Sequence, residues 1–402
     1  MKEIELRDYD YVLPSDRIAQ HPVAERDRSK LLVLKNNKIS SDIFSNIGNH
    51  IPAGSLLVFN NTKVIRARIL FRKYTGAVVE ILLLEPYLPA DYELSFSSTK
   101  PVEWRCIVGN LKKWKRGAVE LKFNKAGKEC KLTAEKVCIE GDACIIRFGW
   151  ACSGSSFGEI IETAGHLPLP PYIEREDTEE DINRYQTVYS RIKGSVAAPT
   201  AGLHFTDNVF EKIREHGINR TEITLHVGAG TFKPVKCDNI SGHEMHTEHF
   251  FVTSETIKTL LANSGRIIPV GTTSVRTLES LYWIGSKAIN DPDLYKKGMS
   301  LGQWEPYSLQ GDVTVSDSLE ALLSIMNDNE LQILNASTEI IIVPGYEFKM
   351  INGMVTNFHQ PGSTLLLLIS AWVGETWKKV YSYAIENEFR FLSYGDSSIL
   401  LK

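Results

Sequence analysis

VIRARILF (64–71) opens a series of six short apolar runs that sets one domain of this chain apart. The series continues with AVVEILLL (77–84), WRCIVG (104–109), AVELKF (118–123), KECKLTAEKV (128–137) and ACIIRFG (143–149), separated by glycines and polar turns. Six closely spaced strands with no helix between them are typical of a small antiparallel barrel. We therefore expect a β-barrel domain over residues 64–155.

Strands and helices alternate in the remainder of the chain. KLLVLK (30–35) and SLLVFN (55–60) predict two strands ahead of the barrel. After residue 156, helical patterns such as DNVFEKIREHG (207–217) alternate with strand patterns such as INRTEITLHV (218–227) and TEIIIVPG (338–345). This alternation predicts an α/β core with a mostly parallel sheet.

The barrel is expected to be inserted in that core, because the two opening strands cannot form a domain alone. Residues 1–63 and 156–402 would then make the core, with 64–155 as the barrel. The less regular stretch 284–336 is expected to be an elaboration between two core elements. A length of 402 residues fits two domains.

Composition and charge exclude several classes of protein. The formal net charge is −4, so any contact with nucleic acid must come from a local basic patch. The longest uncharged apolar run, STLLLLISAWVG (363–374), is shorter than the ~20 residues of a membrane span. The N-terminus lacks the apolar region of a secretory signal. We expect a cytoplasmic protein that has no membrane partner and acts as a monomer.

The cysteines form no CxxC pair, which argues against a zinc ribbon or a redox pair. They are Cys106, Cys130, Cys138, Cys144, Cys152 and Cys237. We expect reduced, mostly buried thiols.

Several polar loops rich in glycine or histidine follow predicted strands, where open α/β sheets bind ligands. The first is GSVAAPTAGLHFT (194–206), whose small residues let a ligand approach the backbone. Its amides suit a carboxylate or a phosphate. Thr200 and Gly202 are candidate binding residues and His204 a candidate proton carrier. The alternative is a tight loop around a buried histidine.

The second loop is LHVGAGTFKP (225–234). It resembles a dinucleotide-binding loop only superficially, because a lysine stands where the third glycine belongs. His226 is a candidate proton carrier, and Gly228, Gly230 and Thr231 are candidate binding residues. Plain turn chemistry remains an alternative.

The third segment is HEMHTEH (243–249), which carries three histidines spaced by three. A zinc-binding HExxH helix needs an i,i+4 pair, so a metal site is not favoured. Histidine is suited to proton transfer near neutral pH. His243, Glu244 and His246 are therefore candidates for acid–base work, with solvated loop histidines as the alternative.

Two further loops lead directly into predicted helices. GTTSVR (271–276) offers Thr272, Thr273, Ser274 and Arg276, and TNFHQPGST (356–364) offers Asn357 and His359. Helix capping alone would explain the hydroxyl groups. Ligand binding by the same loops is the functional alternative.

A serine-hydrolase interpretation rests on GSSFG (154–158), which matches G-x-S-x-G with Ser156 as the nucleophile. The stretch falls at the expected junction of barrel and core, where glycine and serine also serve as a linker.

A basic patch in the barrel is the candidate RNA contact. Lys112, Lys113, Lys115 and Arg116 surround Trp114, so phosphates and a stacked base could both be bound. A solvated hairpin tip is the alternative.

Taken together, the ordered segments of this chain resemble the S-adenosylmethionine:tRNA ribosyltransferase-isomerases of queuosine biosynthesis. The resemblance runs through IAQHPVAERDRSKLLVL (18–34), LLVFNNTKVIRARI (56–69), GHLPLPPYIER (165–175), RYQTVYS (184–190), the loops quoted above, PGYEFK (344–349) and FRFLSYGD (389–396). It implies a β-barrel joined to an α/β core. It also implies S-adenosylmethionine as a co-substrate, no metal or other cofactor, and a tRNA with a queuosine-type anticodon as partner.

The reaction implied by the resemblance joins the ribosyl group of S-adenosylmethionine to 7-aminomethyl-7-deazaguanine at the tRNA wobble position. Epoxyqueuosine forms, and adenine and methionine leave. The histidines above and Glu244 are the available proton carriers. Arg276 or the loop amides would hold the methionine carboxylate, and Tyr346 joins the candidate binding residues.

Departures from the family's usual pattern leave other functions open. Gln360 stands where the family usually has leucine, Gly362 where it has lysine, and Asn352 where it often has aspartate. The stretch 284–336 is also longer than usual. A paralogue with an altered acceptor and a tRNA-binding protein without catalysis remain alternatives.

Overall fold

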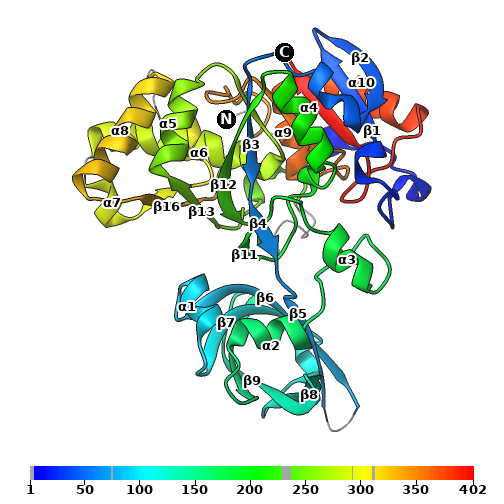
Figure 1. Cartoon of the computed structure of the whole chain (residues 1–402), viewed down its shortest axis with the longest axis vertical. Helices are drawn as coiled ribbons and strands as arrows, with labels where there is room; N and C mark the ends of the chain where they lie inside the picture. Colours follow the sequence, from blue (N-terminus) through cyan, green and yellow to red (C-terminus); the bar gives the residue numbers. More distant parts are fainter. Residues whose placement is uncertain (1–3, 74–75, 229–236, 292, 310–312) are drawn as a thin grey trace.

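The computed structural model describes residues 4–73, 76–228, 237–291, 293–309 and 313–402. They form a six-stranded barrel and an α/β core, and the barrel lies below the core in the view of Figure 1. The chain leaves the core after β4 (Thr62–Val64) and enters it again after α2 (Phe157–Ala164), so the barrel is an insertion.

The barrel closes through antiparallel pairs only, in the order β10-β7-β6-β5-β8-β9. Alternate side chains of each strand point inward, and Phe71, Val79 and Ile81 are fully buried. The predicted antiparallel barrel is confirmed, with one strand in each of the six quoted runs. The strands are β5 (Arg68–Arg72), β6 (Val78–Leu88), β7 (Val102–Gly109), β8 (Val119–Lys125), β9 (Lys128–Glu140) and β10 (Ala143–Ala151).

Two short helices, α1 (Tyr92–Ser97) and α2, pack against the barrel. Phe157 of α2 is fully buried there, with its ring centroid 5.7 Å from that of Trp104. The packing places α2 with the barrel, whereas the boundary expected at residue 155 assigned this helix to the core.

A six-stranded sheet forms the centre of the core, in the order β14-β3-β12-β13-β16-β15. The first three strands are parallel neighbours, but β13 runs antiparallel to both β12 and β16. The strands are β3 (Leu56–Asn60), β12 (Asn219–His226), β13 (Glu248–Thr253), β14 (Ile267–Pro269), β15 (Met299–Leu301) and β16 (Ile333–Thr338).

A second core sheet has the order β17-β18-β1-β2, where β17 is Gly353–Asn357, β18 Ser397–Leu401, β1 Lys30–Lys35 and β2 Lys38–Ile43. Asn36 and Asn37 join β1 to β2 with positive φ angles of 51° and 58°, which suits a two-residue hairpin. Parallel strands need a much longer crossover. The expected α/β core is present, but its sheets are mixed rather than mostly parallel.

The helix expected over residues 207–217 is present, together with other helices of the core. They are α4 (Asp207–Glu215), α5 (Ser254–Ala262), α6 (Thr272–Asn290), α9 (Thr364–Val373) and α10 (Thr376–Glu386). No helix in the described ranges is long and apolar enough to cross a membrane.

The stretch 284–336 is built into the core. It holds the end of α6, strand β15 and α8 (Val315–Asp328), whose Leu319 and Leu322 join the main apolar cluster. A Cβ at Gly285 of α6 would lie only 2.3 Å from the backbone oxygen of Ser318, so the two helices touch closely there. The stretch therefore contributes to the central packing of the core.

The strand predicted over residues 338–345 is wrong in most of its length. Strand β16 ends at Thr338, and residues 340–343 follow in an irregular, buried conformation. Ile340 and Ile342 pack into one apolar cluster, and Ile341 and Val343 into another. An apolar run that is buried on both sides looks like a strand in sequence, although it does not continue the sheet here.

The expectation of six reduced cysteines is wrong for one pair. Cys130 and Cys152 form a disulfide, with their Cα atoms 5.0 Å apart. The register of β9 and β10 places Lys131 opposite Ala151, so the next residues along the two strands face each other. This pairing is set by the hairpin register and leaves no CxxC signature. Cys106 and Cys144 are buried thiols, and Cys138 is an exposed one.

Candidate active site

A cavity of about 400 Å³ lies where several core strands end. Val227 follows β12, Gly271 follows β14, and Asn357 closes β17. A parallel bridge between Val270 and Val355 brings the ends of β14 and β17 together. The cavity thus occupies the carboxyl edge of the strands, where α/β proteins place ligands.

The cavity gathers about half of the residues expected to catalyse or bind. Those that line it are Thr200, His243, His246, Thr272, Thr273, Arg276, Asn357 and His359. His204, His226, Glu244, Gly202, Gly228, Ser274 and Tyr346 are not part of its lining. Gly230 and Thr231 lie outside the described residues.

His226 lies on the barrel side of β12. Its ring stacks on Tyr92 of α1 with centroids 4.1 Å apart, and the neighbouring Val227 faces the cavity. Burial, with a smaller effect from His249, lowers the pKa of His226 to about 4. A Cβ on Gly194 would meet the His226 ring at 2.6 Å, so this glycine is needed for the contact. The structure therefore places His226 at the junction with the barrel and away from the cavity.

Three of the candidate binding residues have structural contacts instead. The Ser274 hydroxyl, in the first turn of α6, donates to the backbone oxygen of Val270, which precedes the helix. The Tyr346 hydroxyl donates to the buried carboxylate of Glu279 at 2.9 Å. A Cβ at Gly202 would lie 1.9 Å from the Tyr189 hydroxyl, so glycine is required there by packing.

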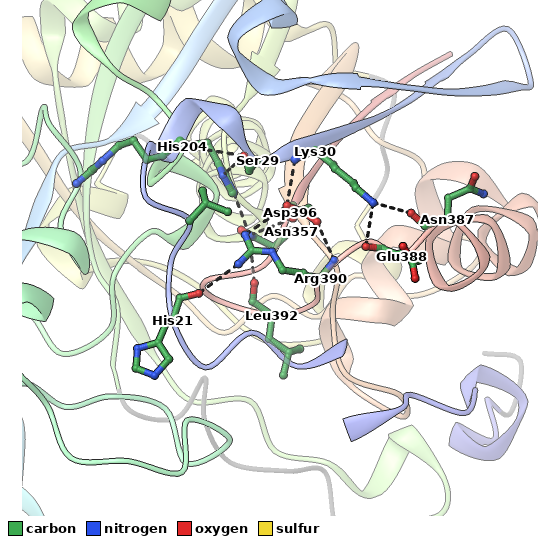
Figure 2. Close-up of polar contacts among 12 residues, drawn as sticks. His21, Ser29, Lys30, His204, Asn357, Asn387, Glu388, Arg390, Leu392 and Asp396 are labelled. Atoms are coloured by element: carbon green, nitrogen blue, oxygen red, sulfur yellow. Dashed lines mark hydrogen bonds and ion pairs between the residues drawn. The ribbon is translucent and has the colours of Figure 1, made fainter. Parts of the chain in front are cut away.

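His204 lies behind the cavity wall and acts on it through Asn357. Figure 2 shows the ring between Ser29 and Asn357, with Nδ1 2.8 Å from the Ser29 hydroxyl and Nε2 3.3 Å from the Asn357 amide nitrogen. The Asn357 side-chain oxygen accepts from the Thr200 hydroxyl at 3.3 Å. Burial, assisted by Arg390, lowers the pKa of His204 to about 3, so the ring is neutral. Its Nε2 therefore accepts from Asn357 and helps to orient two lining residues.

A buried ionic group closes one side of the cavity. Glu248 is completely enclosed and accepts a hydrogen bond from Nη1 of Arg276, whose Nε donates to the Ile340 carbonyl at 3.0 Å. Arg276 Nη2 is buried and has no hydrogen-bond partner among the described residues. Burial alone would raise the pKa of Glu248, but Arg276 and His246 outweigh it and hold the pKa below its ordinary value.

His246 extends this group into the cavity. Its Nε2 lies 3.3 Å from Glu248 Oε1, which is close enough for an ion pair but poorly aligned for a hydrogen bond. Burial, with a smaller effect from His246, lowers the pKa of the neighbouring His243. Glu248 was not among the expected site residues. The signal for it was the alternation in β13, where Glu248, Phe250 and Val252 share the buried face.

His359 lies in the loop after β17 and lines the cavity. Its Nε2 lies 3.0 Å from the Thr356 hydroxyl, and its backbone nitrogen donates to the Tyr381 hydroxyl at 3.1 Å. Its carbonyl accepts from the Tyr11 hydroxyl. Burial lowers the pKa of His359 to about 4, so this lining ring is also neutral at pH 7.

The serine-hydrolase interpretation is not supported. Ser156 is the N-cap of α2, where its hydroxyl accepts from the Glu159 backbone and the Glu159 carboxylate accepts in return. No histidine in the described ranges is hydrogen-bonded to it. In the same ranges, no group of three or more His, Cys, Asp or Glu side chains is arranged to hold a metal ion.

In the candidate RNA patch the basic side chains are exposed, but the aromatic ring is buried. Trp114 is 1% exposed and donates from Nε1 to the Gly117 carbonyl, so its indole is unavailable for stacking on a base. The expectation that Trp114 contacts RNA is therefore corrected. The cations on either side are exposed and form no ion pair within the described ranges; they are Lys112, Lys113, Lys115 and Arg116.

Comparison with known proteins covers nearly the whole chain. Residues 6–400 match the family model described as queuosine biosynthesis protein. An S-adenosylmethionine:tRNA ribosyltransferase-isomerase of Treponema denticola is 37% identical over 401 residues, which cover 98% of this chain and 99% of the relative. One of Thermosipho melanesiensis is 37% identical over 409 residues, with coverage of 99% and 100%.

A solved structure, the S-adenosylmethionine tRNA ribosyltransferase of Thermotoga maritima, is 27% identical with a TM-score of 0.45; the match covers 98% of this chain and 100% of that one. The family match and the two full-length relatives agree with the ordered motifs along the sequence. This chain belongs to the queuosine biosynthesis protein family.

Proposed function

We propose that this chain is an S-adenosylmethionine:tRNA ribosyltransferase-isomerase. It would transfer and rearrange the ribosyl group of S-adenosylmethionine onto 7-aminomethyl-7-deazaguanine in tRNA, releasing adenine and methionine. The observation that carries the proposal is the Arg276–Glu248–His246 group, whose arginine and histidine line a cavity large enough for a small-molecule ligand. Family membership and the names of the two relatives support the same reaction.

The methionine carboxylate is assigned to Arg276. Nη2 of this side chain is buried and has no partner in the part of the chain that the structure describes, and such a donor is costly to leave unpaired. Thr272 and Thr273 begin helix α6 beside it, and the amides of a helix N-terminus favour an anion. Guanidinium and helix terminus together would fix the amino-acid end of the substrate.

His246 is assigned as the proton carrier. If its Nε2–H faces Glu248, Nδ1 carries the lone pair and can take a proton from the substrate. Glu248 stays ionised because Arg276 holds its pKa down, so it stabilises the imidazolium that forms. This division of work resembles other sites in which a carboxylate orients a catalytic histidine.

The assigned chemistry balances with these groups. The sulfonium acidifies the neighbouring C5′ protons, and the base removes one of them. Adenine leaves as the ribose ring opens, and the aminomethyl nitrogen bonds to the ribosyl carbon. The carbanion that this addition leaves beside the sulfur bonds to the aldehyde carbon freed by ring opening and closes a five-carbon ring. The alkoxide formed on that carbon then closes the epoxide and expels methionine, while the protons return through the histidines. The enclosed cavity would shelter the intermediates from water.

The barrel is assigned to tRNA. Four exposed cations of the barrel form no ion pair with any residue that the structure describes; they are Lys112, Lys113, Lys115 and Arg116. The Lys73 ammonium donates to the Lys113 carbonyl at 2.8 Å. In contrast, other barrel cations are paired, such as Arg147 with Glu103. Exposed cations gathered on the connection between β7 and β8 suit a phosphate backbone. Binding of the tRNA backbone by these cations would not depend on the base sequence of the tRNA.

A product assay tests the proposal. Purified protein is mixed with S-adenosylmethionine and tRNA carrying the aminomethyl-deazaguanine base, and the digested RNA is analysed by mass spectrometry. Epoxyqueuosine with equimolar free adenine and methionine is the expected result. A folded protein that binds tRNA but releases no adenine would show that the chain is a binding protein. Adenine release without epoxyqueuosine would point to an altered acceptor.

A further inference from the structure

A second, much smaller hollow lies next to the cavity. Ser393 lines both, and the hollow measures about 20 Å³, which is room for one oxygen-sized group. Three arginines line it: Arg26 from the N-terminal segment, Arg184 at the end of α3 (Glu179–Arg184), and Arg390 after α10. Figure 2 shows Arg390 beside His204 and Asn357.

These guanidinium groups are held mainly by neutral acceptors. Arg26 donates to the carbonyls of Gln186, at 2.9 Å, and Asn183. Arg184 donates to the carbonyls of two residues in the 22–26 segment, Ala24 and Val23. Arg26 and Arg184 therefore connect the segment around residues 22–26 to the segment around residues 183–186. Because the acceptors are carbonyl oxygens, these contacts do not neutralise the charge of either guanidinium group.

Few carboxylates balance the charge of the hollow. Among the described residues, Arg390 pairs with Asp396 at 3.4 Å, and Arg184 pairs with the exposed Glu180 alone, at 3.6 Å. Arg26 forms no ion pair with any residue in the described ranges. The hollow thus carries excess positive charge.

The surroundings of the hollow also act on Arg26 and Arg184. Burial, followed by the nearby charge of Arg184, lowers the pKa of Arg26. The Nε of Arg184 is also buried and lacks a partner among the described residues. Like charges held together in a half-buried place favour an anion, and guanidinium groups match the geometry of phosphate.

We propose that the three-arginine hollow binds a phosphodiester oxygen of the RNA backbone, at the nucleotide whose base enters the cavity. This inference rests on the proposed function. The shared wall at Ser393 places the hollow within one nucleotide of the cavity, as this role requires. The basic connection between β7 and β8 would hold phosphates elsewhere on the tRNA, whereas the hollow would fix the register of the target nucleotide.

The test uses the full chain with Arg184→Gln, which keeps amide donors for the Val23 and Ala24 carbonyls but removes the charge. Binding of substrate tRNA is measured by fluorescence anisotropy over a series of KCl concentrations. We expect about a tenfold loss of affinity and a fall of about 0.7–0.9 in the slope of log K against log salt, the change for one phosphate contact. Affinity for S-adenosylmethionine should stay unchanged. Arg26→Gln should behave in the same way.

Arg147→Gln is the matched control, since Arg147 is a surface arginine already paired with Glu103. It should leave the slope unchanged. An unaltered slope in both hollow variants would overturn the inference, and so would an equal loss of S-adenosylmethionine affinity, which would indicate a purely structural role. Thermal stabilisation by inorganic phosphate that disappears in Arg184→Gln, with no change in the tRNA slope, would show a small-anion site instead.

The product assay on the unaltered chain separates this inference from the proposed function. If the unaltered chain modifies tRNA, and Arg184→Gln and Arg26→Gln bind tRNA with the same salt slope as the unaltered chain, the phosphate site in the hollow is refuted and the proposed function stands. If the unaltered chain neither binds nor modifies tRNA, both fail.

Discussion

Replacing His204 with glutamine should make the folded chain less sensitive to acid. The pKa of His204 is about 3 in the folded protein because the ring is buried, with a smaller effect from Arg390. In the unfolded chain an imidazole titrates near about 6.5. The unfolded state thus binds the proton first as pH falls, so the contribution of His204 to stability is complete above about pH 6.5 and is lost below it.

The magnitude follows from the two pKa values. Between about pH 7.5 and about pH 5, one histidine of this kind removes about 2 kcal/mol from the free energy of unfolding. His226 and His359, whose pKa values are lowered to about 4, add similar losses. His204→Gln should therefore remove about one third of the loss caused by these three rings, because glutamine does not titrate.

Urea-induced unfolding followed by tryptophan fluorescence, at both pH values, measures this difference. His21→Gln is the control, because the His21 ring is exposed. The variant should lose about 2 kcal/mol less than the unaltered chain on going to the lower pH, and the control should lose as much as the unaltered chain. If His204→Gln and the unaltered chain lose equal stability, the buried neutral ring is refuted.

Activity gives a second readout of the same substitution. A positioning role predicts that His204→Gln keeps kcat within about tenfold, because a glutamine oxygen can still accept from Asn357. His204→Leu should lower kcat further, since it leaves that amide without this acceptor. If instead glutamine abolished turnover while binding and folding were normal, His204 would be a proton carrier after all.

Three other substitutions test the site and its packing. Glu248→Gln should lower kcat by about 10²-fold or more with little change in the affinity for S-adenosylmethionine measured by calorimetry, because it removes the charge that stabilises the His246 imidazolium; an unchanged kcat would contradict the assignment. Arg276→Lys keeps a charge beside Glu248 but loses the second donor, so KM for S-adenosylmethionine should rise by about 10-fold or more at nearly constant stability; an unchanged KM would remove Arg276 from the carboxylate site. Gly202→Ala should destabilise the fold by about 1–3 kcal/mol in urea, and Tyr189→Phe should restore part of it by removing the hydroxyl that a Cβ would meet; without such rescue the predicted clash is not the cause.

Local sequence patterns predicted the individual strands and helices of this fold well. They predicted less well how strands that are distant in the sequence pair with one another. The barrel runs alternate with a period of two and are separated by turns, so each predicted one strand. Strand direction depends on the connections, and the two-residue turn at Asn36 and Asn37 makes β1 and β2 antiparallel. Residues 340–343 are buried on both sides, which no period in the sequence distinguishes from a strand.

The site was predicted by loop position rather than by residue type. Loops at strand ends did supply the cavity, but histidine alone did not indicate which rings face it. His226 and Val227 are neighbours on and just after β12, and only the direction of each side chain decides that Val227 lines the cavity. Glu248 was missed because its role depends on Arg276, which comes from a distant segment. Such partners are set by the packing of α6 against the sheet.

The charge pattern of the lining explains why burial of the histidines suits the proposed substrate. S-adenosylmethionine brings a sulfonium cation into the cavity, and a charged imidazole nearby would repel it. Burial keeps His359 neutral, and it lowers the pKa of His243 as well. Among the described lining residues the single permanent cation is Arg276, and its charge is already balanced by Glu248. The lining can therefore accept the sulfonium, while the Arg276 Nη2 donor, which has no partner among the described residues, is available for the carboxylate.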